Sequence, residues 1–392
     1  MSTINYKNQL DAACDKFRAI LEAQLTRVED MKNQGDFVDY AALDTIKIGV
    51  CGGDGIGPTI TKEARRVLEF LLADEIASGK VSFEDIEGLT IENRIAKGKA
   101  IPDDVMAKLK ACHIILKGPT TTPQKGSGMP NIESANVAMR KALDLFANIR
   151  PVKVPEEGIN WTIFRENTEG GYAVGSSGFN VTDDLACDFT ITTKQGSDRI
   201  ARLAYDYARK NGLDRVSLVT KANVIKTTDG NFLEDCHKVA ELYPEITTDE
   251  WYADIMTAKL VDKKRRTMFK VILCPNLYGD IISDEAAEFQ GGVGTAGCAN
   301  IGKKYAMFEA IHGSAPRMVN EGRGAYADPS SMLRACVMLL SHIGYQDRAD
   351  RLERALDICA FEEKKYVITG RPGGATCEEY AEYVMETLAK LA

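Results

Sequence analysis

Two carboxylates stand four residues apart in the segment Gly279-Asp-Ile-Ile-Ser-Asp284. If this segment begins a helix, Asp280 and Asp284 lie on one face, a single turn apart. Carboxylates held this close repel each other unless a cation lies between them, and their hard oxygen atoms suit Mg²⁺ or Mn²⁺. Acids near a helix N-terminus also stabilise the helix dipole, so the pair alone leaves both interpretations open.

A second group of side chains could bind an acidic small molecule. Its members are Ser134, Asn136, Arg140, Arg150 and Arg165. The first three fall at one end of a predicted helix over 134–146, and the other two follow at strand ends or in loops. Guanidinium groups pair with carboxylates through two hydrogen bonds, so the set suits a substrate with several carboxylates. Ordinary surface ion pairs would explain the arginines equally well.

Three further segments carry weaker signals. Lys221 directly follows a buried-type strand, where partial desolvation can make a lysine a general base, although most lysines are simply solvated. His312 precedes a Gly-Ser-Ala-Pro turn, which suits either a cofactor loop or a plain capped turn. Gly53, Gly55 and Gly57 follow a strand, but their G-x-G-x-G spacing departs from the G-x-G-x-x-G of Rossmann folds. The glycines therefore predict only a tight strand-to-helix turn near a ligand.

Composition limits the class of protein. The chain has 392 residues and a formal net charge of −8, which argues against a broad nucleic-acid-binding face. The first eight residues are polar, and no apolar run is long enough to cross a membrane, so we expect no targeting sequence, no membrane partner and a cytoplasmic location. The ten cysteines form no C-x-x-C pair and show no spacing typical of a metal site, which predicts free thiols.

Strand and helix patterns alternate along most of the chain, which predicts an α/β fold. An apolar helical face over 5–33 precedes them, and we expect it to pack on the core or on a partner subunit. The segment 171–195 is turn-rich, with a strand expected over 188–193. We expect this segment to leave the main sheet and form a separate β structure. Expected strands lie at 46–50, 81–84, 113–117, 161–164, 216–220 and 270–274; expected helices at 61–72, 134–146, 197–211, 228–242, 330–344, 347–363 and 377–391.

From about Ile46 to its C-terminus, the sequence resembles the isocitrate/isopropylmalate dehydrogenase family of β-decarboxylating dehydrogenases. Three motifs carry the resemblance, and their joint occurrence by chance is negligible. They are Gly53-Asp-Gly-Ile-Gly-Pro58, Asp144-Leu-Phe-Ala-Asn-Ile-Arg-Pro151 joined to Arg165-Glu-Asn-Thr-Glu-Gly170, and Asn276-Leu-Tyr-Gly-Asp-Ile-Ile-Ser-Asp284.

The resemblance implies a non-Rossmann, isopropylmalate-dehydrogenase-like α/β fold. It also implies a homodimer held together by a β clasp, with the active site shared between subunits. The expected parts are an N-terminal helical extension (1–45), a large α/β domain (46–145 and 291–392), a small α/β domain (146–170 and 196–290) and the clasp (171–195).

The resemblance further implies roles for individual residues. The substrate's carboxylates would be bound by Ser134, Asn136, Arg140, Arg150 and Arg165. Mg²⁺ or Mn²⁺ would be bound by Asp280, Asp284 and, from the other subunit, Asp254. Lys221, also from the other subunit, would act in removing the hydroxyl proton, and Tyr172 would protonate carbon after CO₂ leaves. The cofactor would be bound by Thr121, Thr122, Asn223, His312, Gly313, Arg317 and Asp328.

The pattern Ser134-Ala-Asn136 resembles isocitrate dehydrogenases, in which the serine contacts the third carboxylate of the tricarboxylate substrate. Isopropylmalate-specific members carry apolar residues there, and an unpaired buried polar group costs roughly 1–3 kcal/mol. The resemblance therefore favours isocitrate over homoisocitrate, 3-isopropylmalate, tartrate or another malate derivative. A non-catalytic regulatory subunit of a heteromer is a further alternative, but such chains typically lose the metal aspartates, the lysine or the tyrosine, all of which are present here.

The cofactor signal is divided between NADP and NAD. Where NAD-dependent relatives usually have an aspartate, this chain has Arg317, which is a good partner for the 2′-phosphate of NADP. The segment up to Asp328 is two residues longer than usual, however. The later turn over 369–374 resembles the NAD type, although Arg371 stands where an acid often occurs. The two arginines favour NADP and the loop pattern does not; we expect NADP.

Overall fold

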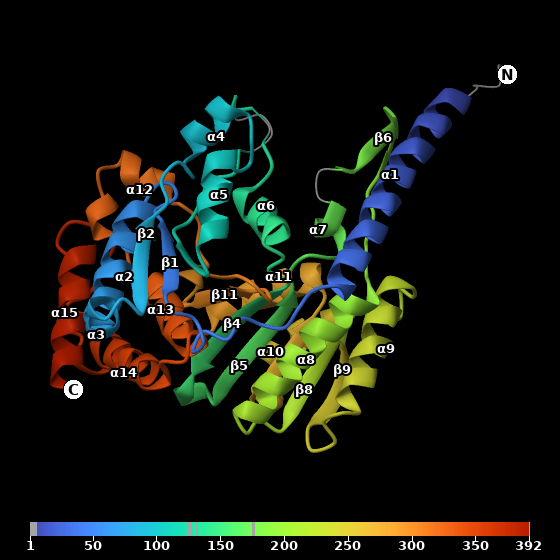
Figure 1. Cartoon of the computed structure of the whole chain (residues 1–392). Coiled ribbons are helices and arrows are strands. Elements are labelled where there is room, and N and C mark those ends of the chain that lie inside the picture. Colours follow the sequence, from blue (N-terminus) through green and yellow to red (C-terminus); the bar gives the residue numbers. More distant parts are fainter. Residues whose placement is uncertain (1–5, 124–127, 131, 175–176, 392) are drawn as a thin grey trace. The chain divides into compact units, whose positions relative to one another are not determined.

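The computed structural model describes residues 6–123, 128–130, 132–174 and 177–391 (Figure 1). The chain divides into two compact units. The first unit comprises residues 1–36 and 157–283, and the second comprises 37–156 and 284–392. Within the described residues, no helix is both long and apolar enough to cross a membrane. The sequence-based domain boundaries stay a prediction.

The second unit is built on a mostly parallel sheet with the strand order β2-β1-β3-β12-β11-β4, in which β11 runs antiparallel to both neighbours. This order is not that of a Rossmann fold. The strands are β1 (Ile46–Cys51), β2 (Val81–Asp85), β3 (Ile114–Lys117), β4 (Ala147–Val154), β11 (Gly297–Ile301) and β12 (Ala306–Ala310). The helices are α2 (Gly57–Leu71), α3 (Ala73–Ala77), α4 (Ile91–Lys97), α5 (Asp103–Ala111), α6 (Ala135–Ala142), α12 (Pro316–Asn320), α13 (Ser330–His342), α14 (Gln346–Asp357) and α15 (Cys377–Lys390).

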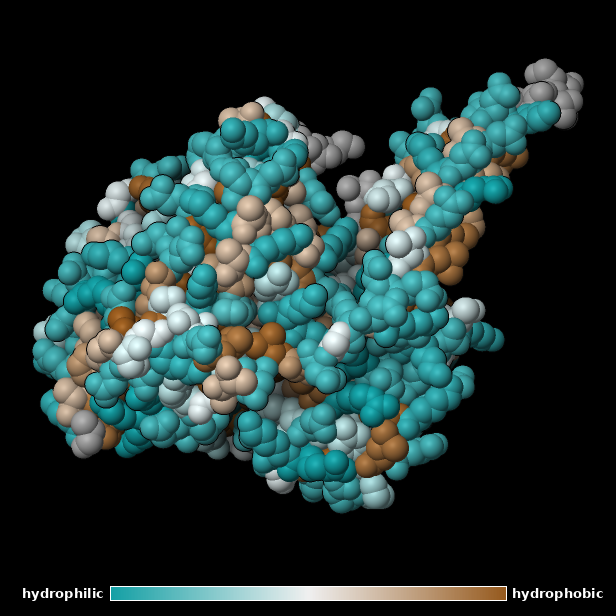
Figure 2. Space-filling view, viewed as in Figure 1, coloured by the Kyte–Doolittle hydropathy of each residue, from teal (hydrophilic) through white to brown (hydrophobic). Residues whose placement is uncertain are grey.

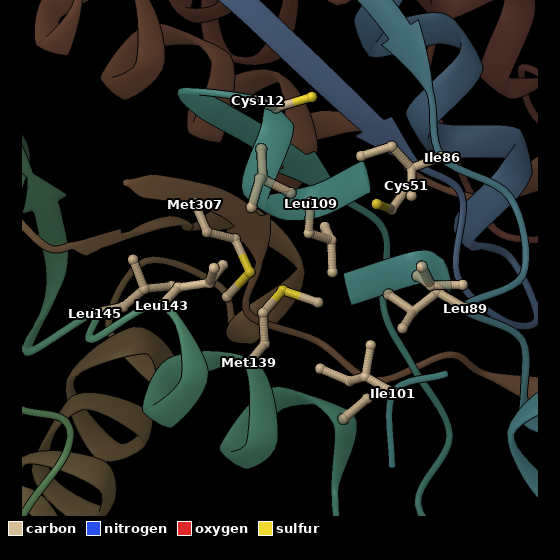
Figure 3. Packing of buried hydrophobic residues seen from close by; sticks show 13 residues of the cluster. Cys51, Ile86, Leu89, Ile101, Leu109, Cys112, Met139, Leu143, Leu145 and Met307 are labelled. Carbon is tan, nitrogen blue, oxygen red and sulfur yellow. The ribbon is translucent and has the colours of Figure 1, made fainter. Parts of the chain in front are cut away.

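The core of the second unit forms because most residues of its central strands are apolar on both faces. Every residue of β3 and β12 is buried, as expected for parallel strands covered by helices. On one face, Leu109 of α5, Met139 of α6 and Met307 of β12 point toward one another (Figure 3). Helix α13 packs on β11 and β12. The sheet thereby holds the loops at its strand ends in fixed positions.

The first unit has a parallel sheet with the order β5-β10-β8-β9. Its strands are β5 (Ile159–Glu166), β8 (Arg215–Thr220), β9 (Thr247–Tyr252) and β10 (Val271–Cys274), and its helices are α1 (Lys7–Lys32), α7 (Gly171–Val174), α8 (Lys194–Lys210), α9 (Thr228–Ala240) and α10 (Ala253–Val261). The amphipathic helix α8 packs its small apolar residues on this sheet. The unit boundary falls within α11 (Asn276–Glu288).

Two sequence-based expectations about secondary structure are wrong. The strand expected over 188–193 is absent: an antiparallel hairpin forms earlier, between β6 (Phe179–Thr182) and β7 (Leu185–Cys187), across a two-residue turn. The turn at 183–184 thus places the second strand at 185–187, and beyond it Ile191 forms an isolated bridge to Gly170. The helix expected over 134–146 ends at Ala142, since Asp144 has a left-handed backbone (φ 46°) and the chain then enters β4.

The N-terminal helix α1 lies along the hairpin strand β6 (Figure 1). The rings of Phe17 on α1 and Phe189 pack with their centroids 4.8 Å apart. Of the described residues of this helix, Met31 alone is buried. Figure 2 shows apolar patches, in brown, along α1, and its large exposed apolar side chains are Leu10, Phe17, Leu21 and Leu25.

Candidate active site

Three residues expected to have different roles contact one another in the first unit. Arg165 is the penultimate residue of β5, Tyr172 lies in the short helix α7, and Asp280 lies in the second turn of α11. The hydroxyl of Tyr172 donates to Asp280 Oδ2 at 2.7 Å, and Arg165 Nη1 donates to Asp280 Oδ1. The side chain of Arg165 is 1% exposed and that of Asp280 is 34% exposed. This cluster therefore holds a buried cation beside a carboxylate that is still accessible.

Asn276 fixes the guanidinium of Arg165 in place. Its Oδ1 accepts hydrogen bonds from Arg165 Nε at 2.9 Å and Nη2 at 2.7 Å, while its Nδ2 donates to the carbonyl of Glu169 at 3.1 Å. Gly279 allows the approach of α11, since a Cβ there would lie 2.6 Å from Cβ and Cγ of Arg165. Sequence reasoning did not single out Asn276 as a site residue, although it begins one of the three motifs.

A second pair in the first unit joins Lys221 and Asp254. Lys221 follows β8, as expected, and its Nζ donates to Asp254 Oδ1. This hydrogen bond lowers the pKa of Asp254. The backbone N–H of Lys221 donates to Asp229 Oδ2 at 2.7 Å, which anchors the turn that also carries the exposed Asn223. The expected proton-transfer lysine and the third expected metal aspartate are therefore adjacent.

The expected metal ligands do not form a complete set in one chain. Asp280 and Asp284 lie one turn apart on α11, as predicted. Within the parts of the chain that the structure describes, no three carboxylate, histidine or cysteine side chains gather as a metal site. The donors present nevertheless fit a hard cation such as Mg²⁺ or Mn²⁺, because they are carboxylate oxygens on partly exposed side chains.

In the second unit, a buried polar network runs between Arg140 and Arg150. Arg150 Nη1 donates to Asp284 Oδ1 at 2.7 Å, and Arg150 Nε donates to Asn148 Oδ1 at 2.8 Å. Asn148 in turn donates to Asn300 Oδ1 on the neighbouring strand β11 at 2.8 Å. Charged and amide groups buried this deeply are stable only when paired, so the network fixes both arginines.

Glu309 is the anion at the centre of this network. It accepts hydrogen bonds from Lys117 at 2.8 Å, Asn300 at 2.9 Å and Arg140 at 3.3 Å. Burial alone would raise its pKa, but the charges of Lys117 and Arg140 outweigh burial and lower the pKa of Glu309 to about 2. The Nε of Arg140 is buried without a hydrogen-bond partner. Sequence reasoning missed both Glu309 and Lys117, because their contact joins segments 192 residues apart.

Glu309 should make stability depend on pH under acid conditions. Its folded-state pKa of about 2 lies below its ordinary value of 4.5, so its contribution is complete above pH 4.5 and is lost as pH falls toward 2. Urea unfolding of the wild type and E309Q across this window measures it. We expect the wild type to lose roughly 3 kcal/mol more than the variant, and parallel pH profiles would contradict this assignment.

Three loops meet at the carboxyl ends of the parallel strands β1, β3 and β12. The glycine turn after β1 makes the closest contacts: a Cβ on Gly53 would lie 2.3 Å from the carbonyl of Pro119, and one on Gly55 would lie 1.9 Å from that of Ser314. Both glycines also have left-handed backbones (φ 72° and 59°). The turn therefore needs glycine for tight loop packing, and ligands of open α/β sheets bind at such strand ends.

The expected cofactor residues of the second unit lie in or beside these loops. Thr121 Oγ1 is 2.7 Å from Ser314 Oγ, and its backbone N–H donates to Asp54 Oδ2 at 2.7 Å. Thr122 is exposed, and His312 and Gly313 lead into the Ser314 turn. Asp328 accepts a hydrogen bond from the backbone N–H of Ser330 at 2.8 Å, a contact that stabilises the start of α13.

Arg317 belongs to a small basic cluster on α12 and the following loop. Its Nε donates to Glu321 Oε1 at 2.6 Å, yet its side chain is 89% exposed. Arg323 donates to Glu321 Oε2 at 2.6 Å and to the carbonyl of Gly370. Hydrogen bonds from Arg317 and Arg323 lower the pKa of Glu321. Two guanidinium groups on one carboxylate leave this surface with a net positive charge.

The two residues expected to select the substrate begin α6. Ser134 occupies the N-cap position but its side chain forms no capping hydrogen bond. Asn136 Oδ1 accepts a hydrogen bond from Thr120 Oγ1 at 3.0 Å, which ties α6 to the loop after β3. Both side chains are half-buried. All ten cysteines lie in the described part of the chain and are free thiols, as predicted.

Comparison with known proteins places these features in a family. Residues 47–384 match the model of the isocitrate/isopropylmalate dehydrogenase family. The chain is 39% identical over 318 residues to an isocitrate dehydrogenase [NADP] of Rickettsia prowazekii, covering 79% of this chain but only 62% of that relative's length. It is 35% identical over 335 residues to a homoisocitrate dehydrogenase of Methanocaldococcus jannaschii, covering 81% and 91% of the two chains.

A solved structure agrees with the sequence comparison. The crystal structure of isocitrate dehydrogenase from Methylococcus capsulatus superposes with a TM-score of 0.75 at 35% identity, covering 88% of this chain and 99% of that one. This likeness confirms the predicted isopropylmalate-dehydrogenase-like α/β fold. Together, the three motifs, the fold and the matched span show that the chain belongs to the isocitrate/isopropylmalate dehydrogenase family.

Proposed function

We propose that the chain is an isocitrate dehydrogenase that converts isocitrate to 2-oxoglutarate and CO₂ and reduces NADP in preference to NAD. The observation that carries this proposal is the contact between Arg165, Tyr172 and Asp280, the residues that we propose bind a substrate carboxylate, donate a proton and bind the metal. These are the groups that oxidation followed by decarboxylation requires.

The residues act in sequence on the bound substrate. Arg165 and Arg150, held by Asn276 and Asn148, pair with substrate carboxylates. Lys221 takes the hydroxyl proton, and its neighbour Asp254 stabilises the charge that the lysine gains. After CO₂ leaves, Tyr172 gives its proton to the carbon that has lost the carboxylate.

A divalent cation bound by Asp280, Asp284 and Asp254 of a second copy of the chain would polarise the substrate hydroxyl and stabilise negative charge on its oxygen. The nicotinamide would accept the hydride. Lys221 and Asp254 are proposed to come from a second copy of the chain in a homodimer.

The choice of isocitrate rests on the polar start of α6. The hydroxyl of Ser134, which forms no capping bond, is free of competition from the helix backbone, and Asn136 is held by Thr120. A substrate with an alkyl group at this point would leave polar groups unpaired, at roughly 1–3 kcal/mol each. Initial rates with isocitrate, homoisocitrate and 3-isopropylmalate, each with Mn²⁺ and either cofactor, test the choice. A higher kcat/KM for either competitor would refute it.

The preference for NADP is expected to depend on Arg317. Its guanidinium is exposed and can pair with a phosphate, and Arg323 adds a second positive charge beside it. Arg317→Asp should lower kcat/KM for NADP about tenfold or more, as expected for loss of a charge-assisted contact of 1.5–3 kcal/mol, with little loss for NAD. Initial rates with each cofactor measure this, and Arg354→Asp on α14, an exposed arginine that is also paired with a glutamate, serves as a control for charge alone. An unchanged NADP/NAD ratio would contradict the assignment.

A further inference from the structure

The N-terminal helix α1 lies outside the family match, which begins at residue 47, yet it contacts the segment that carries the active-site cluster. Arg27 Nη1 donates to Glu169 Oε1 at 3.0 Å, and Arg27 Nη2 donates to Thr168 Oγ1 at 2.9 Å. The side chain of Glu169 is only 4% exposed, and that of Arg27 is 23% exposed. One guanidinium therefore makes two directed hydrogen bonds to two residues of the same loop.

This loop, residues 166–170, connects Arg165 to the helix α7 that holds Tyr172. Glu166 and Glu169 are both buried in it. Burial and then the charge of Glu169 raise the pKa of Glu166 to about 7. Two arginines place positive charge beside these acids. Arg199 of α8 donates from Nη2 to Thr168 Oγ1 at 3.0 Å, and Arg27 donates directly to Glu169.

The two ends of the loop have different partners. Arg165 is held by Asn276 and Asp280. Toward Tyr172, the loop is held at Glu169, whose carboxylate accepts hydrogen bonds from the backbone and hydroxyl of Thr193 and from Arg27, and whose carbonyl accepts one from Asn276. A shift of the Glu169 side chain would be transmitted along the loop to Tyr172, three residues further on.

We propose that Arg27 is a positioning residue for catalysis: through Glu169 and Thr168, helix α1 holds the loop that places Tyr172 against Asp280. The proposal rests on the function proposed above, because it assigns Tyr172 the final proton transfer. It gives a role in the chemistry to helix α1, which lies outside the residues that match the family.

The test compares Arg27→Met, which removes the charge, with Arg27→Lys, which keeps it, in the full-length protein. With Arg27→Met we expect kcat to fall roughly tenfold, because small misplacements of a reacting group have effects of this size, while KM for isocitrate changes little. The solvent deuterium isotope effect on kcat should rise, since proton donation becomes slower. Arg27→Lys should restore part of kcat. Arg18→Met, an exposed arginine on the same helix, is the matched control.

Hydrogen exchange of peptides covering residues 166–174 gives a second readout that does not depend on activity. We expect faster exchange there in Arg27→Met than in the wild type or in Arg18→Met. If the wild type does not oxidise isocitrate, the proposed function fails, and the exchange result still decides whether Arg27 holds the loop. Normal exchange together with an unchanged kcat and isotope effect in Arg27→Met overturns the proposal, as does a loss of kcat without any change in exchange.

Discussion

Replacing Lys221 by methionine should lower kcat for isocitrate by about 10²- to 10⁴-fold, the usual range for loss of a general acid–base group. The structure gives the reason: Lys221 stands at the end of β8, with its Nζ on Asp254 and its backbone fixed by Asp229. Methionine keeps the length and apolar stem of lysine and removes only the ammonium group. KM for isocitrate should change far less than kcat, because the substrate carboxylates are bound by arginines.

Lys226→Met provides the matched control, since this lysine is exposed and lies five residues further along the same segment. It should retain wild-type kcat. Steady-state rates of both variants at saturating Mn²⁺ and NADP make the comparison. A Lys221→Met variant with more than a third of wild-type kcat would remove this lysine from the mechanism.

Replacing Asp280 by asparagine should lower kcat/KM by roughly 10³-fold, because a metal contribution of several kcal/mol is lost and each 1.36 kcal/mol corresponds to a factor of ten. Asparagine keeps an oxygen that can accept from Arg165 or Tyr172, so the cluster can keep much of its geometry. The Mn²⁺ concentration for half-maximal rate should rise strongly. That shift distinguishes loss of a metal ligand from loss of an ion pair.

Arg165 complicates this variant, because removing the partner of a buried charge costs about 3–5 kcal/mol of stability. Thermal unfolding monitored by circular dichroism shows whether the variant is folded at the assay temperature. Glu288→Gln, an exposed acid on the same helix, should leave both the rate and the Mn²⁺ requirement unchanged. An Asp280→Asn variant with normal dependence on Mn²⁺ would contradict the role of Asp280.

Sequence reasoning identified those features that are local in the chain. The helical spacing of Asp280 and Asp284, the lysine after β8 and the glycine turn after β1 all follow from short-range patterns. The sequence predicted the tight turn but not the contact that makes Gly55 necessary. Ser314 packs against Gly55, and that contact joins distant segments.

Features that depend on distant segments could not be predicted in this way. The local sequence around Glu309 does not distinguish it from other glutamates. Its position beside Lys117 results from the pairing of β12 with β3. Arg27 reads as one charge among many on an amphipathic helix, and nothing in its local pattern indicates that it meets Glu169. The strand expected over 188–193 failed for a related reason, since pairing of β6 with β7 is decided by the turn between them.

The central claim is tested most directly by incubating the full-length protein with ¹³C-labelled isocitrate, Mn²⁺ and NADP and following the products by NMR. We expect 2-oxoglutarate, CO₂ and NADPH in equal amounts, and no reaction once a chelator removes the metal. Failure to turn over isocitrate with either NADP or NAD in the presence of Mn²⁺ would contradict it, most decisively if the same preparation oxidises homoisocitrate or 3-isopropylmalate.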